Sequence, residues 1–193
     1  MENKYQDKQA FIAEKEKILS RDDLSKKGKV DDEIKDLVDA INSKEDYCTT
    51  SSCAGRITLL ERKSSKKIDA TWLYSSHNPA LFSELNDNLK SSSDVWLMQE
   101  SCILHIFCRN LDSASLFLQA CRNAGFKRTG IVALKNKIMI ETMGNEKVEA
   151  LLIKDGDILV DEKYLKALVD ESNSRMLKNR AKMNLLKKEV EKL

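Results

Sequence analysis

The stretch ILHIFCRNLDSASLFLQACRNAG, residues 103–125, changes its hydrophobic period partway along. From Ile103 to Arg109 the side chains alternate between two faces, as they do in a β-strand. From Ser113 to Ala124 the apolar residues recur at helical spacing, with Asp112 placed to cap the helix and Gly125 to end it. The stretch therefore predicts a strand followed directly by an amphipathic helix.

Both periods recur on either side of this stretch. Helices are predicted over 4–19, from Asp31, over 78–89 with Pro79 at the first helical position, and from Asp161 to about Lys192. Strands are predicted over 56–61, 68–75, 95–99, 127–133, 137–142, 148–153 and 157–160, the last two joined by an Asp155-Gly156 turn. Strands in pairs with helices between them are typical of an α+β fold, with mixed or antiparallel sheet strands, packed helices and a long C-terminal helix.

The distribution of glycine and proline bears on domain organisation. No GxGxxG follows a predicted strand, which argues against a Rossmann fold. The chain has one Pro and six Gly, and no stretch rich in them divides it. We therefore expect a single domain over 1–193.

The composition limits where the chain works and what it binds. With 193 residues and a net charge of +2, it can bury a core, and any nucleic-acid contact must come from a local basic patch. The longest apolar run, Cys102 to Cys108, is too short to cross a membrane, and the N-terminus has no apolar signal. Five cysteines without an export signal indicate reduced thiols in the cytosol or nucleus, and we expect a cytoplasmic protein. Their spacing predicts no metal site.

Small polar residues are concentrated from Cys48 to Cys53 and are followed by Gly55 and Arg56. We expect the backbone N–H groups and hydroxyls from Ser51 to Gly55 to form a cradle for an anion or polar ligand, with Arg56 pairing a carboxylate or phosphate. The alternative is an ordinary polar loop before a strand, with Arg56 in solvent.

Three further polar clusters lie at the ends of predicted elements. The segment from Asp23 to Asp31 is either a capped loop between helices or part of a site. Trp72 is either a packing residue or a flat face for a base or a sulfonium cation, with His77 just beyond its strand. Glu100 and Ser101 precede the strand that carries His105, whose alternatives are a structural histidine and a catalytic one.

The C-terminal segment over 174–193 is a basic helical extension. Its arginines and lysines outnumber its glutamates, and its apolar residues are sparser than in the first half of the helix. A solvated, frayed helix is one interpretation, and a contact with the arm of an RNA is the other.

Taken together, these clusters resemble one family, tRNA wybutosine-synthesising protein three. The resemblance is carried by DLSKKGKVDDEIKDLVDAIN (23–42), YCTTSSCAGRI (47–57), Trp72 with His77 five positions on, ESCILHIFCR (100–109) and NAGFKRTGIV (123–132). It covers about Ser20 to Tyr164. A glycine often precedes the tryptophan in the family, where this chain has Thr71.

The resemblance implies a methyl transfer from S-adenosylmethionine to the N4 nitrogen of a tricyclic guanosine derivative beside the anticodon of phenylalanine tRNA, a step of wybutosine biosynthesis. It also implies an α+β fold unlike that of Rossmann methyltransferases. Our candidates for catalysis are His77, His105 and Asp23. Those for cofactor binding are Ser51, Ser52, Cys53, Gly55, Arg56, Trp72, Glu100 and Ser101, and those for tRNA binding are Ser25, Lys26, Lys27, Lys29 and Arg109.

A physical hypothesis follows from the resemblance. The reacting nitrogen loses a proton during methyl transfer, and a histidine suits that task, so His77 or His105 is the candidate base, with Asp23 a third. Arg56 would hold a carboxylate, and Trp72 would stack on the tricycle. Two rival functions remain: a non-catalytic RNA-binding module, and a hydrolase with Cys53 as nucleophile.

Overall fold

The computed structural model describes residues 7–21, 29–62 and 70–193. The chain folds into two compact units, and neither is a continuous stretch of sequence. Unit 1 comprises Met1–Ala54, Cys102–Asn145 and Arg180–Leu193, and unit 2 comprises Gly55–Ser101 and Glu146–Asn179. Among the described residues, no helix is both long and apolar enough to cross a lipid bilayer.

Unit 1 contains an antiparallel sheet, here called sheet 1. In the described residues its strand order is β1-β5-β7-β6, from β1 (Tyr47–Cys53), β5 (Ile103–Cys108), β7 (Ile138–Met143) and β6 (Arg128–Ala133). Its helices are α1 (Lys8–Leu19), α2 (Asp32–Asn42), α4 (Leu111–Asn123) and the end of α5 (Glu162–Glu191).

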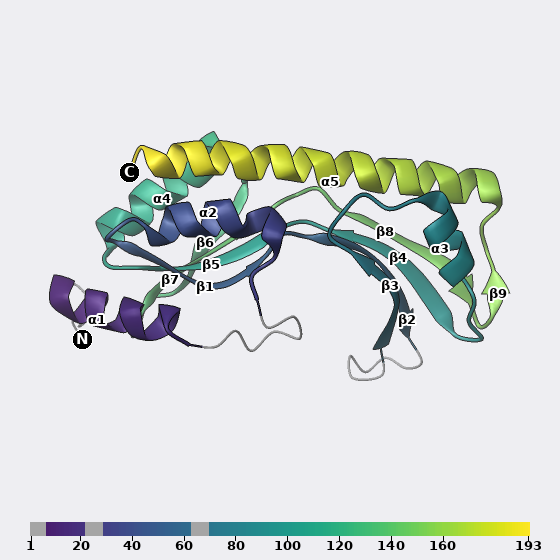
Figure 1. Cartoon of the computed structure of the whole chain (residues 1–193), viewed down its shortest axis with the longest axis horizontal. Helices are drawn as coiled ribbons and strands as arrows, with labels where there is room; N and C mark the ends of the chain where they lie inside the picture. The colour runs from purple at the N-terminus through teal and green to yellow at the C-terminus, as the bar shows by residue number, and fades with distance from the viewer. Residues whose placement is uncertain (1–6, 22–28, 63–69) are drawn as a thin grey trace. The chain divides into compact units, whose positions relative to one another are not determined.

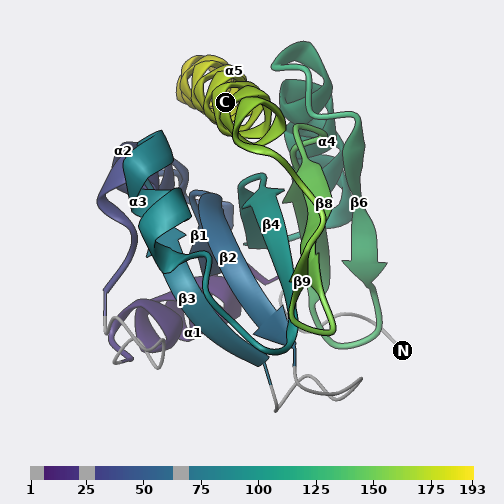
Figure 2. The ribbon, with the colours of Figure 1, turned by 90° about the vertical axis from the view of Figure 1, so that its right-hand side faces the viewer.

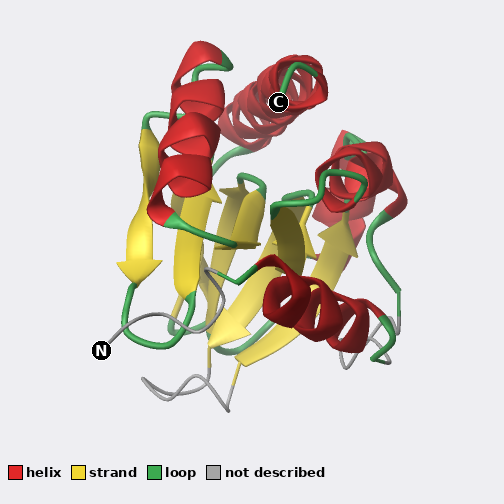
Figure 3. Ribbon diagram, turned by 90° about the vertical axis from the view of Figure 1, so that its left-hand side faces the viewer, coloured by secondary structure: helices red, strands yellow, loops and turns green. Residues whose placement is uncertain are grey.

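Helices pack on both faces of sheet 1, as Figure 3 shows. The predicted alternation along β5 is confirmed: Leu104 and Ile106 belong to a core shared with α2, α4 and the end of α5. Phe107 faces the other way and packs on Phe11 of α1, with ring centroids 4.8 Å apart. α1 and α2 therefore lie on opposite sides of the sheet (Figure 1).

Unit 2 contains a second antiparallel sheet, here called sheet 2. Its order in the described residues is β3-β2-β4-β8-β9, from β3 (Ala70–Ser76), β2 (Arg56–Arg62), β4 (Asp94–Glu100), β8 (Val148–Lys154) and β9 (Asp157–Ile158). α3 (Phe82–Asn88) and the first part of α5 pack on one face of it, around Leu59, Leu97 and Leu165 (Figure 2). The predicted hairpin is confirmed, because Asp155 and Gly156 both have positive φ, of 51° and 90°.

The long C-terminal helix is confirmed, but its second half is not a solvated, frayed end. Its buried positions alternate in steps of four and three along all 30 residues of α5. They are Leu165, Val169, Ser172, Met176, Asn179, Met183, Leu186 and Val190. The first part belongs to the core of unit 2, and Met183, Leu186 and Val190 belong to the core of unit 1.

Several predicted boundaries were wrong for identifiable reasons. α3 begins at Phe82, three residues after Pro79, with Glu84 accepting from the N–H of Leu81. The cap of α4 is Asn110 and not Asp112, because the Asn110 side chain accepts from the N–H of Ser113 at 2.8 Å. α1 begins at Lys8, capped by Asp7.

Candidate functional site

The candidate residues of unit 2 meet at one end of sheet 2. β2 begins at Arg56 and β4 ends at Glu100, and the register places these two residues opposite each other. The Arg56 Nε donates to a Glu100 carboxylate oxygen at 3.1 Å. The same guanidinium lies 4.2 Å from the centre of the Trp72 ring. The three side chains therefore form one cluster, in which a carboxylate orients a cation on an indole face.

His77 is fixed just beyond β3 by the backbone of the same unit. Its Nδ1 lies 2.8 Å from the carbonyl oxygen of Gly55. A carbonyl only accepts, so Nδ1 carries the proton and the lone pair of the neutral ring lies on Nε2, the form that a general base needs. Gly55 has φ of 84°, in the left-handed region that favours glycine, so its conformation aims this carbonyl.

Ser101 is also held by unit 2. Its hydroxyl donates to the carbonyl oxygen of Glu146 at 2.5 Å. This bond joins the residue after β4 to the segment before β8. Ser101 thus acts on the backbone beside the Arg56 cluster.

The stretch with the small polar residues is a strand and not a loop. β1 runs from Tyr47 to Cys53, and Ser51, Ser52 and Cys53 pair with His105, Leu104 and Ile103 of β5. β1 is an edge strand that pairs with β5 alone among the described strands, so only part of its backbone is used in the sheet, and the cradle over Ser51 to Gly55 stays a prediction. The register shifts between Thr49 and Ser51, which is a β-bulge that redirects the last residues of the strand.

Asp31 lies at the N-cap position of α2, as predicted, but makes no cap bond. Its carboxylate instead accepts from the buried N–H of Ala54 at 3.0 Å. This bond ties the start of α2 to the residue that follows β1. Asp31 therefore fixes the end of the polar stretch, at Ala54, against the start of α2.

His105 belongs to a polar row across sheet 1. Its Nε2 lies 2.9 Å from a carboxylate oxygen of Glu141, the residue opposite it on β7, and Ser51 is opposite it on β1. Because a carboxylate accepts, Nε2 carries the proton, and the lone pair of the neutral ring lies on Nδ1. His105 and His77 thus present opposite ring nitrogens as proton acceptors.

The predicted tRNA contacts are placed only in part. Asp23, Ser25, Lys26 and Lys27 lie outside the described residues. Lys29 pairs with Asp32 at 3.2 Å on the surface of unit 1. Arg109 donates from Nε and Nη2 to both oxygens of Asp46, and this bond raises the pKa of Arg109. Its guanidinium is therefore already engaged within unit 1.

Comparisons with known proteins identify the family of this chain. A family described as Methyltransferase TYW3 matches residues 6–192. The chain belongs to the TYW3 methyltransferase family. A relative from Archaeoglobus fulgidus, named tRNA(Phe) 7-((3-amino-3-carboxypropyl)-4-demethylwyosine(37)-N(4))-methyltransferase, is 35% identical over 181 residues, which are 93% of this chain and 92% of the relative.

Relatives of the TYW3 family extend to vertebrates and to solved structures. The tRNA wybutosine-synthesizing protein 3 homolog of Xenopus laevis is 34% identical, over 91% of this chain and 72% of that protein. A solved structure from Pyrococcus horikoshii is 30% identical, has a TM-score of 0.86 and covers 96% of this chain and 98% of its own. The resemblance seen in the sequence is confirmed, and so is the α+β fold that is not a Rossmann fold.

The thiols of this TYW3 chain differ in their surroundings. None of the five cysteines, all of which the structure describes, forms a disulfide, and Cys53 alone is partly exposed. Burial raises the pKa of Cys48 to about 11 and that of Cys121 to about 12, so neither forms a thiolate near neutral pH. Only Cys53 has the exposure that a nucleophile requires.

Three side chains beside the candidate residues were missed. Glu141 orients His105, and Arg62 lies over the Trp96 ring at 5.4 Å on sheet 2. The alternation along β4 would have placed Trp96 and Glu100 on one face, and that signal was present in the sequence. The pairing of β4 with β2, which brings Arg62 alongside, was not.

Proposed function

We propose that this chain methylates the N4 nitrogen of 7-(3-amino-3-carboxypropyl)-4-demethylwyosine at position 37 of phenylalanine tRNA, during wybutosine biosynthesis. The relative from Archaeoglobus fulgidus carries the proposal, since its name states this reaction and the match spans 93% of this chain and 92% of that one.

We propose S-adenosylmethionine as the methyl donor, held by the Arg56 cluster of unit 2. The donor supplies an electrophilic methyl group on a sulfonium cation. The residues fit such a ligand: Arg56 offers a planar fork for a carboxylate, and Glu100 is 41% exposed beside it. Trp72 positions the Arg56 guanidinium over one face of its ring, 4.2 Å from the ring centre. Ser101 supports the backbone next to Glu100. Binding by Ser51, Ser52, Cys53 and Gly55 stays a prediction.

His77 is our candidate for the base that removes the proton from the reacting nitrogen. The bond from its Nδ1 to Gly55 leaves the lone pair of the neutral ring on Nε2. A bond of 2.8 Å to a backbone carbonyl also restrains the ring, and proton transfer requires such positioning. Five cysteines without a disulfide fit a reducing compartment, and we propose that the reaction takes place in the cytoplasm.

The test is a methylation assay read by mass spectrometry. Purified protein receives S-adenosylmethionine and phenylalanine tRNA from cells that lack this step, and the modified nucleoside is weighed. We expect a gain of one methyl group, and a loss of about 100-fold or more in rate for Arg56→Gln. Lys166→Gln, which removes a surface charge paired with Glu162 on α5, is the matched control and should leave the rate unchanged.

The same assay separates the rival functions. No methyl gain, together with no binding of S-adenosylmethionine by calorimetry, would sink the methyltransferase and favour an RNA-binding module. Retention of full activity in Cys53→Ser would exclude a role of that thiol as nucleophile, since the hydroxyl is a far weaker one at neutral pH.

A further inference from the structure

One face of sheet 2 is left uncovered by the described helices of its unit. α3 and the first part of α5 pack on the opposite face, against residues such as Leu59 and Leu97 (Figures 1 and 2). Because side chains alternate along a strand, the neighbours of those residues point away from the helices. We call this surface the tryptophan face, and define it by Arg56, Leu60, Arg62, Trp72, Trp96 and Met98.

The register aligns the two tryptophans across the sheet. Trp72 on β3 lies opposite Leu60 on β2, and Leu60 lies opposite Trp96 on β4. Neighbouring strands are about 4.8 Å apart, so the two tryptophan positions are separated by about 10 Å. Trp72 remains 47% exposed. An apolar row of this kind on an uncovered sheet face indicates a binding surface.

An arginine lies over each tryptophan ring, and only one of the two arginines is paired with a carboxylate among the described residues. Arg56 lies 4.2 Å from the centre of the Trp72 ring and is bonded to Glu100. Arg62 lies 5.4 Å from the centre of the Trp96 ring and donates to the Met98 sulfur at 3.9 Å. Within the described part of the chain, Arg62 has no carboxylate partner. Asp94 lies opposite Arg62 on β4 and pairs with Lys154 at 2.8 Å, so the described residues at this end are two cations and one carboxylate, with a net positive charge.

We propose that the tryptophan face is a platform on which unpaired bases of an RNA loop stack, with Trp72 and Trp96 as the stacking rings and Arg62 as a phosphate contact. Spaced aromatic rings beside an unbalanced cation match the alternation of bases and phosphates in a single strand. The proposal rests on the proposed function, and assigns the surface of unit 2 that receives the anticodon loop.

The chain offers an internal reporter for this test. Its two tryptophans both lie on this face, so all tryptophan fluorescence comes from it. Titration with a single-stranded oligoadenylate should quench that fluorescence to saturation, and the matched RNA duplex should do so much less. Trp96→Leu and Arg62→Gln should each weaken binding by about 5- to 100-fold, and Trp96→Phe, which keeps a ring, should weaken it least.

Lys166→Gln on α5 removes the same charge as Arg62→Gln away from the face, and should bind like the parent. Binding that is unchanged in both Trp96→Leu and Arg62→Gln would overturn the platform, as would a dimer that buries the tryptophans without RNA. A parent that methylates tRNA with a KM unaffected by either variant would overturn the platform and leave the proposed function standing. If the parent lacked methyltransferase activity but its fluorescence were still quenched by RNA, and the variants lost that quenching, the platform would stand and the proposed function would not.

Discussion

At the scale of single residues, the two histidines differ in which ring nitrogen donates a hydrogen bond within the protein. His77 uses Nδ1 on the Gly55 carbonyl, and His105 uses Nε2 on Glu141. The amide of asparagine can replace an Nδ1 donor, and that of glutamine can replace an Nε2 donor. Each histidine can therefore be exchanged for a side chain that keeps its hydrogen bond and has no basic nitrogen.

We expect His77→Asn to lower kcat of methyl transfer by about 100- to 10,000-fold, the usual contribution of a general base. The affinity for S-adenosylmethionine should change little, because the bond to Gly55 is kept. His105→Gln is the matched variant and should retain most of the rate. Single-turnover kinetics with calorimetry would measure both. A large loss in His105→Gln with normal turnover in His77→Asn would transfer the role to His105.

The bond from Asp31 to Ala54 makes a prediction about stability. Asp31 is 8% exposed and Ala54 is 5% exposed, so Asp31→Ala would leave a buried N–H without its acceptor. We expect a loss of about 1–3 kcal/mol in the free energy of unfolding. Asp31→Asn keeps an oxygen acceptor and should lose less. Equal urea midpoints for Asp31→Ala and the parent would show that the bond is not needed.

At the scale of elements, the sequence predicted those helices and strands whose own hydrophobic period is regular. β5 and α4 were predicted because their periods are regular. β1 was not, because its hydroxyl residues do not alternate with apolar ones. The structure explains their presence: β1 is an edge strand of sheet 1 and begins with the buried Tyr47 and Cys48, and edge strands tolerate polar residues.

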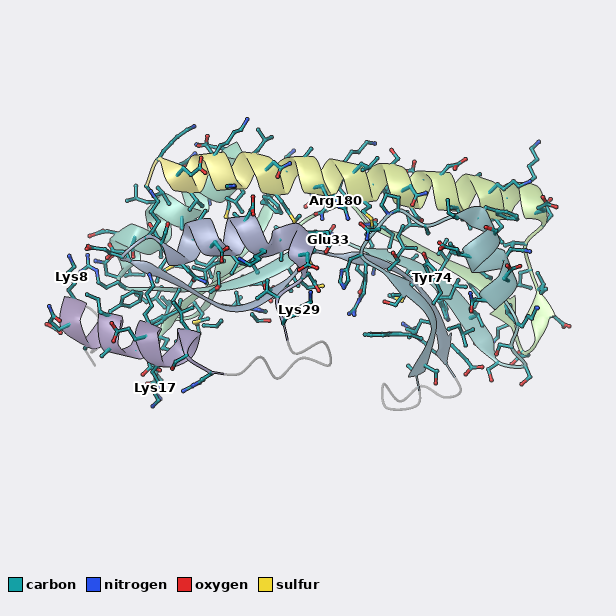
Figure 4. All side chains as sticks on the ribbon, viewed as in Figure 1. Lys8, Lys17, Lys29, Glu33, Tyr74 and Arg180 are labelled. Atoms are coloured by element: carbon teal, nitrogen blue, oxygen red, sulfur yellow. The ribbon has the colours of Figure 1, made fainter. Side chains whose placement is uncertain are left out.

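The second half of α5 was misjudged for a related reason. Its buried stripe includes Ser172 and Asn179, so a count of apolar residues alone hides the regular spacing from Leu165 to Val190. Its charged side chains are also engaged in part. Arg180 lies 4.0 Å from Glu33 of α2, and Figure 4 shows these two labelled side chains close together. In the second half of α5, the regular spacing of positions therefore indicates burial better than the amino-acid composition does.

The ion pair between Glu14 of α1 and Lys137 has a pH dependence that can be predicted. Lys137 donates to Glu14 at 2.6 Å, and this bond lowers the pKa of Glu14 from its ordinary value of 4.5. A carboxyl with a lower pKa in the folded chain adds stability above pH 4.5, and this is lost as the pH falls through the folded-state pKa. We therefore expect the hydrogen-exchange protection of α1 amides to fall as the pH drops below 4.5.

Glu14→Gln tests this assignment. The variant should show reduced α1 protection at neutral pH and little further loss in acid. Glu16→Gln is the control, because Glu16 is exposed on the same helix. If α1 in the Glu14→Gln variant still loosened in acid as it does in the parent, another carboxyl would be responsible.

At the scale of the whole molecule, what the sequence could not predict is strand pairing. The Arg56–Glu100 and His105–Glu141 contacts join strands far apart in the chain, and their register follows from packing that no local pattern encodes. The family resemblance identified Arg56, Trp72 and Glu100 together, but not Arg62 or Trp96. Residues that meet through the pairing of distant strands could be predicted to lie together only where a family motif contained them.

The interleaving of the two units makes cooperativity the remaining question. The chain passes between them after Ala54, Ser101, Asn145 and Asn179, and α5 supplies residues to both cores. A single domain over 1–193 requires that damage to the core of unit 1 also destabilise unit 2. Both tryptophans belong to unit 2, so their fluorescence reports the unfolding of that unit alone.

Leu186→Ala supplies the damage, because Leu186 is fully buried in the core of unit 1. The loss should be about 2–5 kcal/mol, which lowers a urea midpoint by about 1–2 M. We expect the tryptophan midpoint to fall by that amount, together with the exchange protection of β5 and β7. An unshifted tryptophan transition with lost protection in sheet 1 would instead establish two independently folding domains. The interleaved connections favour a shared transition. If one unit unfolds, its segments become flexible loops that join the segments of the other unit, and closing such loops costs the other unit free energy.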